Sequence, residues 1–349
     1  MIVVTTLASA WVETELPPAL ASVATNERAN MQYAIQTRGL TKFYGSKAVV
    51  RSLDLQVPTG CVYGFLGRNG AGKSTTIKLL TGMIHPDHGT AEVLGEDVAT
   101  LSVATRGRIA YIAEGHPLYG WMTINQLERF SRPFYATWNR PLFDRIIDHF
   151  ELSRTQKVRR FSNGQRAQVS LALALAPDPE LLILDDPTLG LDTVVRRDFL
   201  ESMIQIIQRE GRTILFSSHI LGDVERVADR IGVIVDGVLR VDCPTDHFKS
   251  TVKLVIAEFA TAAPPLVEIP GLVSGLVNGR RWELVVAGYG EQQADLLQRS
   301  KPIAIEVVEL NLEDAFIAYT RGRRRIFAND PPTSPESPPI LSTSSRETV

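Results

Sequence analysis

The stretch CVYGFLGRNGAGKST, residues 61–75, decides the fold. An apolar run with the length of a buried strand leads into Gly67, Gly72, Lys73 and Ser74, which match the pattern G-x-x-x-x-G-K-[ST]. Glycines let the backbone wrap closely around a polyphosphate, and a helix that begins near Gly72 adds its positive end. We expect Lys73 to reach the β- and γ-phosphates and the Ser74 hydroxyl to ligate Mg²⁺. The stretch therefore predicts a nucleoside triphosphate site between a strand and a helix.

A second strand-like stretch ends in acidic residues. In LLILDDPTLGLD, residues 181–192, an apolar run leads directly into Asp185 and Asp186. Such a strand places its carboxylates at the carboxyl edge of a parallel sheet, where ligands bind in folds of this kind. We expect Asp185 to hold Mg²⁺ through water and Asp186 to lie near the γ-phosphate.

The middle of the chain alternates strand and helix patterns. Apolar runs of strand length occur at 61–67, 108–113, 180–186 and 212–218, and helical patterns follow several of them. The best of these covers 193–209, where one face carries Phe199, Leu200, Met203, Ile204 and Ile207. Alternation of this kind predicts an α/β fold with a largely parallel sheet covered by helices.

Composition excludes several classes of protein. The chain has 349 residues, of which 44% are hydrophobic and 22% charged, and a formal net charge of -2. No window approaches 18 uninterrupted apolar residues, so nothing here is expected to span a membrane alone. The near-neutral charge argues against a protein that coats nucleic acid. Two cysteines, Cys61 and Cys243, cannot form a disulfide framework and are interpreted as buried or free thiols in a reducing cytosol.

The order of motifs resembles that of ATP-binding cassette proteins. The segment FSNGQRAQVSLALALAPDPELLILDD, residues 161–186, is similar to the family's signature motif (LSGGQ in its commonest spelling), which directly precedes the acidic strand. The resemblance covers roughly 37–243. The other family elements follow in family order: an aromatic residue at Tyr44, the Q-loop position at Glu114, the D-loop at Gly190, Leu191 and Asp192, and the switch histidine at His219.

The resemblance implies a P-loop NTPase cassette that binds ATP and Mg²⁺. Its core would be a mostly parallel sheet, accompanied by an antiparallel β subdomain, an α-helical subdomain at about 115–176 and a small C-terminal α/β unit. By this resemblance the catalytic residues are Asp186, His219 and Glu114, and the metal site consists of Ser74, Asp185 and Glu114. The nucleotide contacts are Tyr44, which would stack on adenine, Gly67, Asn69, Gly70, Gly72, Lys73, Ser74, Thr75, Ser162, Gly164, Gln165 and Asp192.

The resemblance also implies how such a subunit works. Two cassettes pair head to tail, and each ATP lies between the phosphate loop of one subunit and the signature helix of the other. ATP then holds the dimer closed, hydrolysis reopens it, and an attached membrane permease responds to this ligand-linked switch. The expected partners are a permease and a second cassette subunit, identical or different, without nucleic acid. The expected location is the cytoplasmic face of the cell membrane.

Three positions depart from the family pattern. Asp186 stands where the family usually has Glu, and its side chain is about 1.5 Å shorter. Since a positioned base contributes about 10²–10⁴ in rate, turnover is expected to be slow unless the backbone compensates. Asn163 replaces a signature glycine, and Glu114 replaces Gln but is still expected to reach the metal or its waters.

The chain divides into four expected regions. Residues 1–30 are predicted to be a disordered extension, 31–250 the ATPase domain, 251–320 a small α/β accessory domain, and 321–349 a basic, Pro- and Ser-rich disordered tail. Arginines at the start of the tail are interpreted as a solvated run, with contact to anionic lipid headgroups as the alternative.

The leading function is an ATPase that drives a separately encoded permease, in the export direction. Aromatic residues concentrate in 115–150, and HPLYGWM at 116–122 is expected to receive part of the permease. A soluble cassette ATPase acting on ribosomes or DNA is less favoured, because one phosphate loop is present and no heptad run separates Lys73 from Ser162. An importer ATPase is also less favoured, because 252–320 is short for the regulatory β-domain common in sugar importers.

We predict that a chain beginning at Met31 will fold and bind ATP like the full chain, because 1–30 carries no recognisable motif. The melting temperature with and without Mg²⁺-ATP checks this, with the full chain as control. A large drop on truncation would show that the extension packs against the body of the protein.

Overall fold

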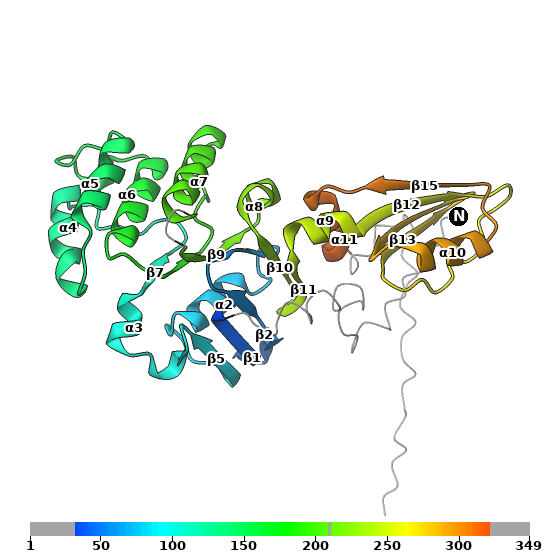
Figure 1. The fold of residues 1–349 in the computed structure, drawn as a ribbon, viewed down its shortest axis with the longest axis horizontal. Helices are drawn as coiled ribbons and strands as arrows, with labels where there is room; N and C mark the ends of the chain where they lie inside the picture. Colours follow the sequence, from blue (N-terminus) through cyan, green and yellow to red (C-terminus); the bar gives the residue numbers. More distant parts are fainter. Residues whose placement is uncertain (1–31, 209–210, 322–349) are drawn as a thin grey trace, which may run out of the picture.

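The computed structural model describes residues 32–208 and 211–321, so the expected extension 1–30 and nearly all of the expected tail 321–349 lie outside it. Within these residues the chain forms three β-sheets (Figure 1). The central sheet has the order β11-β10-β4-β9-β8-β7, and only its β10–β11 pair is antiparallel. Its strands are β4 (Val62–Leu66), β7 (Ile109–Ile112), β8 (Leu181–Leu184), β9 (Thr213–Ser218), β10 (Arg230–Val235) and β11 (Val238–Pro244). The four apolar runs predicted as strands are β4, β7, β8 and β9, which confirms the largely parallel sheet.

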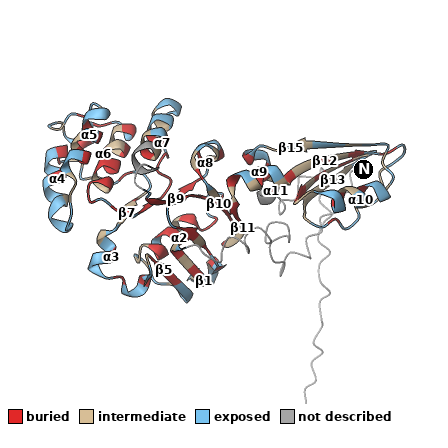
Figure 2. Ribbon diagram, viewed as in Figure 1, coloured by how far each residue is buried: buried red, intermediate tan, exposed pale blue. Residues whose placement is uncertain are grey.

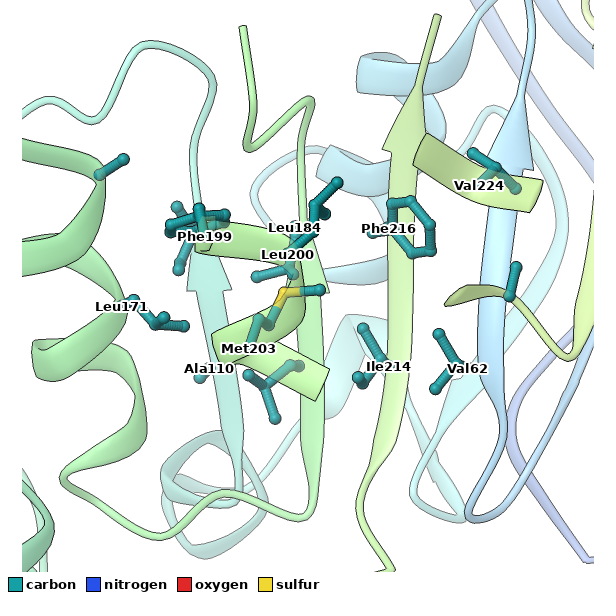
Figure 3. Close-up of a cluster of buried hydrophobic side chains, with 14 of the residues drawn as sticks. Val62, Ala110, Leu171, Leu184, Phe199, Leu200, Met203, Ile214, Phe216 and Val224 are labelled. Carbon is teal, nitrogen blue, oxygen red and sulfur yellow. The ribbon is translucent and has the colours of Figure 1, made fainter. Parts of the chain in front are cut away.

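Apolar side chains cover both faces of this sheet. Every residue of β4, β8 and β9 is buried, as expected for parallel strands packed on both sides. On one face, Leu184 packs in a cluster with Phe199 and Met203 of α7 (Thr193–Gln208), as Figure 3 shows. On the other, Ile183 packs in a cluster with Ile77 of α2 (Lys73–Leu80). The helix predicted at 193–209 is therefore α7, and its apolar face meets the sheet.

The second sheet is the antiparallel layer beside α2. Its order is β2-β1-β5-β6, and β3 also pairs with β1. The strands are β1 (Tyr33–Tyr44), β2 (Lys47–Leu53), β3 (Gln56–Pro58), β5 (His88–Val93) and β6 (Glu96–Asp97). Ile35 and Val93 of this layer belong to the same apolar cluster as Ile77, so the antiparallel sheet and the central sheet enclose α2 between them. A 3₁₀ turn, η2 (Val98–Thr100), and α3 (Val103–Gly107) lead back to β7.

A helical segment connects β7 to β8. It contains α4 (Ile124–Ser131), η3 (Arg132–Phe134), α5 (Arg140–His149), η4 (Val158–Arg160) and α6 (Asn163–Leu175). Each α-helix begins at a residue whose side chain accepts a hydrogen bond from a backbone N–H of the first turn: Thr123, Asn139 and Ser162. Thr123 and Ser162 also form capping boxes with Gln126 and Gln165. These caps explain where the helices start.

The third sheet lies at the end of the described chain. Its order is β13-β14-β12-β15, formed by β12 (Val252–Glu258), β13 (Leu272–Asn278), β14 (Arg281–Ala287) and β15 (Ala304–Glu309). Trp282, Leu284 and Val286 of β14 face a core that includes Leu297 of α10 (Glu291–Arg299). Asn278 pairs with Arg281, so the β13–β14 loop begins at Gly279, whose φ of 59° suits the first central position of a two-residue hairpin.

The last helix ties this unit back to the rest of the protein. Helix α11 (Leu312–Arg321) packs beside α8 (Leu221–Val227) and α9 (Thr245–Thr251), as Figure 1 shows. Leu312, Ala315 and Phe316 belong to the same apolar cluster as the central sheet, and buried residues continue across the junction in Figure 2. The expected boundary at 250/251 falls within the last turn of α9, one residue before β12 begins, and the apolar packing crosses it.

Both cysteines are buried free thiols, as composition predicted. Burial raises the pKa of each thiol to about 12, so neither is a reactive thiolate. No helix in the described ranges has both the length and the apolar composition that a bilayer crossing requires.

We predict that Trp282→Ala will loosen the C-terminal unit. Trp282 is 0% exposed, contacts Phe259 with ring centroids 4.8 Å apart, and its Nε1 donates to the Pro264 carbonyl at 2.9 Å. Truncating a buried aromatic costs about 3–5 kcal/mol. Hydrogen exchange in β12–β15 should accelerate while β4, β8 and β9 stay protected.

Trp282→Phe is the matched control, because it keeps an aromatic ring at this position while removing the Nε1 donor and only part of the buried ring volume. It should accelerate exchange far less than Trp282→Ala. Equal protection in Trp282→Ala and the unaltered chain would show that this ring does not anchor the unit.

Candidate active site

The loop between β4 and α2 is shaped by glycines at its two ends. A Cβ on Gly67 would lie 2.8 Å from the Ile234 carbonyl oxygen, and one on Gly72 would lie 2.7 Å from the Val49 carbonyl oxygen. Gly72, which caps α2, also has a φ of 112°, a conformation that side chains rarely adopt. The crest of the loop, at 68–70, is exposed. The backbone is therefore pinned at both ends and open at the crest, as a phosphate cradle requires.

Lys73 lies under this loop. The residue is 7% exposed, and its Nζ donates a hydrogen bond to the Gly67 carbonyl at 2.7 Å. Burial lowers the pKa of Lys73, and the nearby carboxylates of Asp186, Asp185 and Glu114 oppose that shift. The Lys73 ammonium group therefore lies near Asp185, Asp186 and Glu114, which the sequence analysis assigned to the same site.

Asp185 joins the ends of three elements. It follows β8 and is 2% exposed. Its Oδ1 accepts hydrogen bonds from Ser74 Oγ at 3.1 Å, at the start of α2, and from Ser217 Oγ at 2.9 Å, at the end of β9. The strand order β4-β9-β8 makes this possible, because it places the end of β9 between the phosphate loop and the acidic residues.

Asp186 is held by residues at the end of β9. Its backbone N–H donates to Ser217 Oγ at 2.9 Å, and its Oδ2 accepts from His219 Nδ1 at 2.6 Å. The residue is 7% exposed, and its φ of 46° is left-handed, which Asp tolerates better than most residues. Its Oδ1 is buried and has no hydrogen-bond partner among the described residues. A buried carboxylate oxygen without a partner is a free proton acceptor.

These groups fit Mg²⁺. The hydroxyl of Ser74 and the carboxylate of Asp185 are hard oxygen ligands, which Mg²⁺ prefers. The described residues contain no cluster of three His, Cys, Asp or Glu side chains that could hold a metal by themselves. Magnesium usually keeps waters and substrate phosphates as ligands, so a site with few protein ligands is what it requires.

Other expected site residues lie around this centre. Tyr44 ends β1 with 53% of its surface exposed, so its ring is accessible. Glu114 is exposed just beyond β7 and lies near enough to raise the pKa of Lys73 and Tyr111. Asn69 and Gly70 lie on the exposed crest of the loop, and Thr75 is half-buried in the first turn of α2.

The signature residues form a separate constellation. Ser162 Oγ accepts from the Gln165 N–H at 3.2 Å, and Gln165 Oε1 accepts from the Ser162 N–H at 3.1 Å. A Cβ on Gly164 would lie 2.5 Å from Val195 Cγ1, so the glycine allows α6 to approach α7 closely. Figure 1 shows α6 on the far side of β7, well apart from α2. The fold does not bring these residues to the phosphate loop of the same chain.

Asp192 has a structural role at the start of α7. Its Oδ1 accepts from the N–H groups of Val194 and Val195 at 3.1 and 3.0 Å, which is N-capping geometry. The structure does not place this side chain against the phosphate loop.

The sequence analysis missed the role of Ser217. This buried hydroxyl accepts from the Asp186 N–H and donates to Asp185 Oδ1, yet Ser217 is not among the expected site residues. The available signal was its place at the carboxyl end of a buried strand.

The comparisons with known proteins agree with this geometry. A family model described as ABC transporter matches residues 50–189. The chain is 30% identical over 291 residues to the ABC transporter ATP-binding protein YtrB of Bacillus subtilis (strain 168), covering 83% of this chain and 99% of that protein. It is 36% identical over 224 residues to the daunorubicin/doxorubicin resistance ATP-binding protein DrrA of Streptomyces peucetius, covering 62% and 67%.

The fold has counterparts among solved structures. An ATP-binding subunit of an ABC transporter matches with a TM-score of 0.58 at 27% identity, over 62% of this chain and 92% of that chain. The likeness to YtrB spans nearly that whole protein, and the family model covers the phosphate loop and both acidic residues. The chain therefore belongs to the ABC transporter family, as an ATP-binding subunit with ATPase activity.

Proposed function

We propose that this chain binds Mg²⁺-ATP at the carboxyl edge of the central sheet and hydrolyses it with Asp186 as the base. The observation that carries the proposal is the buried Oδ1 of Asp186, which has no partner among the described residues. It belongs to the same carboxylate that His219 holds at 2.6 Å, close to Lys73 and Asp185. A fixed carboxylate with one free oxygen is suited to take a proton from an attacking water.

The remaining groups divide the work of binding. Lys73 exchanges its bond to the Gly67 carbonyl for the β- and γ-phosphates, and Tyr44 supplies an exposed ring for adenine. Ser74, Asp185 and Glu114 hold Mg²⁺ directly or through its waters, and the bound ion supplies charge neutralisation on the phosphates. His219 fixes Asp186 through Nδ1. Phosphate oxygens only accept, so Nε2 can donate to the γ-phosphate only in the imidazolium form, in which both ring nitrogens carry a hydrogen.

A second cassette completes the site. Ser162, Gly164 and Gln165 lie at the start of α6, apart from the phosphate loop of their own chain, so they serve the nucleotide of a partner subunit. Free N–H groups at a helix start suit an anion. Asn163, which replaces the signature glycine, lies near Gly190: a Cβ on Gly190 would be 3.6 Å from Asn163 Nδ2.

An exposed aromatic surface fits the membrane permease with which ABC ATPases work. Tyr119, Trp121, Phe130 and Phe134 are 53%, 62%, 44% and 72% exposed. Their rings form a chain of contacts, with centroids 6.1 Å apart for Tyr119–Trp121 and 5.5 Å for both Tyr119–Phe130 and Phe130–Phe134. Exposed aromatics gathered in this way mark protein interaction sites.

The direction of transport is proposed to be export. DrrA is by its description a daunorubicin/doxorubicin resistance protein. An ATP-binding subunit of a transporter gives resistance when it drives removal of the drug from the cell, which favours export.

We predict that Asp186→Asn will keep ATP binding and lower hydrolysis by about 10²–10⁴-fold, because an amide cannot accept the proton. Asn tolerates the left-handed φ of 46° as Asp does, so the backbone is preserved. ATP turnover and light scattering should show a slow enzyme that forms ATP-dependent dimers.

Lys73→Ala is the control for loss of nucleotide contact. It should abolish ATP-dependent dimers as well as hydrolysis while the fold persists. Hydrolysis by Asp186→Asn at the unaltered rate would refute the base assignment and leave His219 or substrate-assisted attack.

We predict that Trp121→Ser combined with Phe134→Ser will reduce recovery of a polytopic membrane protein with this chain from detergent-solubilised membranes. Ile303→Ser is the matched control, because Ile303 is 66% exposed on the C-terminal unit, away from the aromatic surface. Equal recovery with both variants would place the permease contact elsewhere.

A further inference from the structure

A histidine outside the assigned catalytic set joins two loops that are distant in sequence. His116 is 4% exposed, although Gly115 and Pro117 on either side of it are exposed. Its Nε2 lies 2.9 Å from the carbonyl oxygen of Pro187, the residue that follows Asp186. A carbonyl only accepts, so Nε2 carries the hydrogen and donates it.

The ring of His116 is buried. His116 Nδ1 is buried without a hydrogen-bond partner among the described residues, and the ring meets that of Phe199 at an interplanar angle of 62°. The His116 φ of 50° is left-handed, a conformation that His adopts more readily than most residues. Among the described residues, the bond to Pro187 is the one hydrogen bond of the His116 ring, while the His116 backbone N–H donates to the Ala113 carbonyl at 3.2 Å.

The bond acts on the loop that carries the proposed base. Asp186 is held on one side by Ser217 and His219. On the other side, the peptide after Pro187 is oriented by His116, and Thr188 Oγ1 donates to Asp223 Oδ2 at 3.2 Å. The orientation of this peptide determines where the Asp186 backbone can lie.

The same histidine also begins the segment that leads to the aromatic surface. Tyr119 lies three residues after His116, and Trp121 two residues further on. The chain then reaches the Thr123 cap of α4. The residue that bonds Pro187 thus lies on the same short segment as two aromatic residues of the exposed surface.

We propose that His116 is a positioning residue that seats the Asp186 loop and couples it to the segment 115–122. Asp186 is productive only while the His116–Pro187 hydrogen bond holds, so displacement of the segment at the aromatic surface changes hydrolysis. This inference rests on the proposed function, because it assumes that Asp186 is the base.

The test compares His116→Leu with His116→Gln in the full chain. In both variants a residue other than His occupies the same positive φ, so both lose the same backbone preference. Only the Gln side chain can donate a hydrogen bond to the Pro187 carbonyl. We expect His116→Leu to lower kcat by about 10- to 100-fold, the effect of misplacing a reacting group by about 1 Å. The KM for ATP should stay within about twofold, and His116→Gln should recover most of the rate.

A spectroscopic readout tests the coupling. The Mg²⁺-ATP-dependent change in Trp121 fluorescence is obtained by subtracting the response of Trp121→Phe in each background. We expect this change in the unaltered chain and in His116→Gln, and its loss in His116→Leu. If His116 had only a structural role, both variants would change the stability of the protein, and His116→Gln and His116→Leu would not differ in both kcat and the Trp121 response.

Several outcomes overturn the inference: an unaltered kcat in His116→Leu, an equal loss in His116→Gln, a Trp121 response that persists in His116→Leu, or no such response in the unaltered chain. Failure of the proposed function is distinguishable, because Lys73→Ala and Asp186→Asn would then hydrolyse ATP at the unaltered rate. If only the positioning role is wrong, those two variants fail while His116→Leu does not.

Discussion

The burial of charged groups at one edge of the central sheet is the constraint on which the site depends. Lys73 and Asp185 are 7% and 2% exposed, and burying a charge is costly unless it is paired and hydrogen-bonded. Ser74 and Ser217 supply the hydroxyls that Asp185 needs. Because these donors come from α2 and β9, the charges can be buried only when the ends of β4, β9 and β8 are in register. The chemistry and the fold thus impose the same geometry.

The site is nevertheless left incomplete. Asp186 has a left-handed backbone and one buried oxygen without a partner among the described residues, two features that cost stability and that concentrate at functional sites. Lys73 donates to its own loop at 2.7 Å, and a phosphate would offer that ammonium a stronger, charge-assisted partner. Under the proposed function, bound nucleotide would replace a weak internal contact with a strong one, and differential contacts of this kind can drive a conformational switch.

The loop from Asp186 to Asp192 connects the separate parts of the molecule. Its first residue bonds His219, Pro187 bonds His116, Thr188 bonds Asp223, and Asp192 caps α7. The helical segment with α6 and the aromatic surface lies beyond β7, away from the phosphate loop. The phosphate loop and the start of α6 therefore do not meet within one chain. The loop from Asp186 to Asp192 connects the acidic residues to α7 and to the segment that leads to the aromatic surface.

The sequence by itself determined the parts that depend on short, local patterns. The strands β4, β7, β8 and β9 followed from apolar runs, and the phosphate loop followed from glycines that no other residue replaces at such close approach. Only the tertiary structure decided which distant groups meet. Ser217 and Asp185 come together because β9 lies beside β8, and His116 reaches Pro187 because the parallel strands β7 and β8 are neighbours and both residues follow their carboxyl ends. Neither contact leaves a periodic trace in the sequence, since each depends on strand order. The packing of α11 on α8 was hidden for the same reason: an amphipathic helix shows which face is apolar, not which surface will cover it.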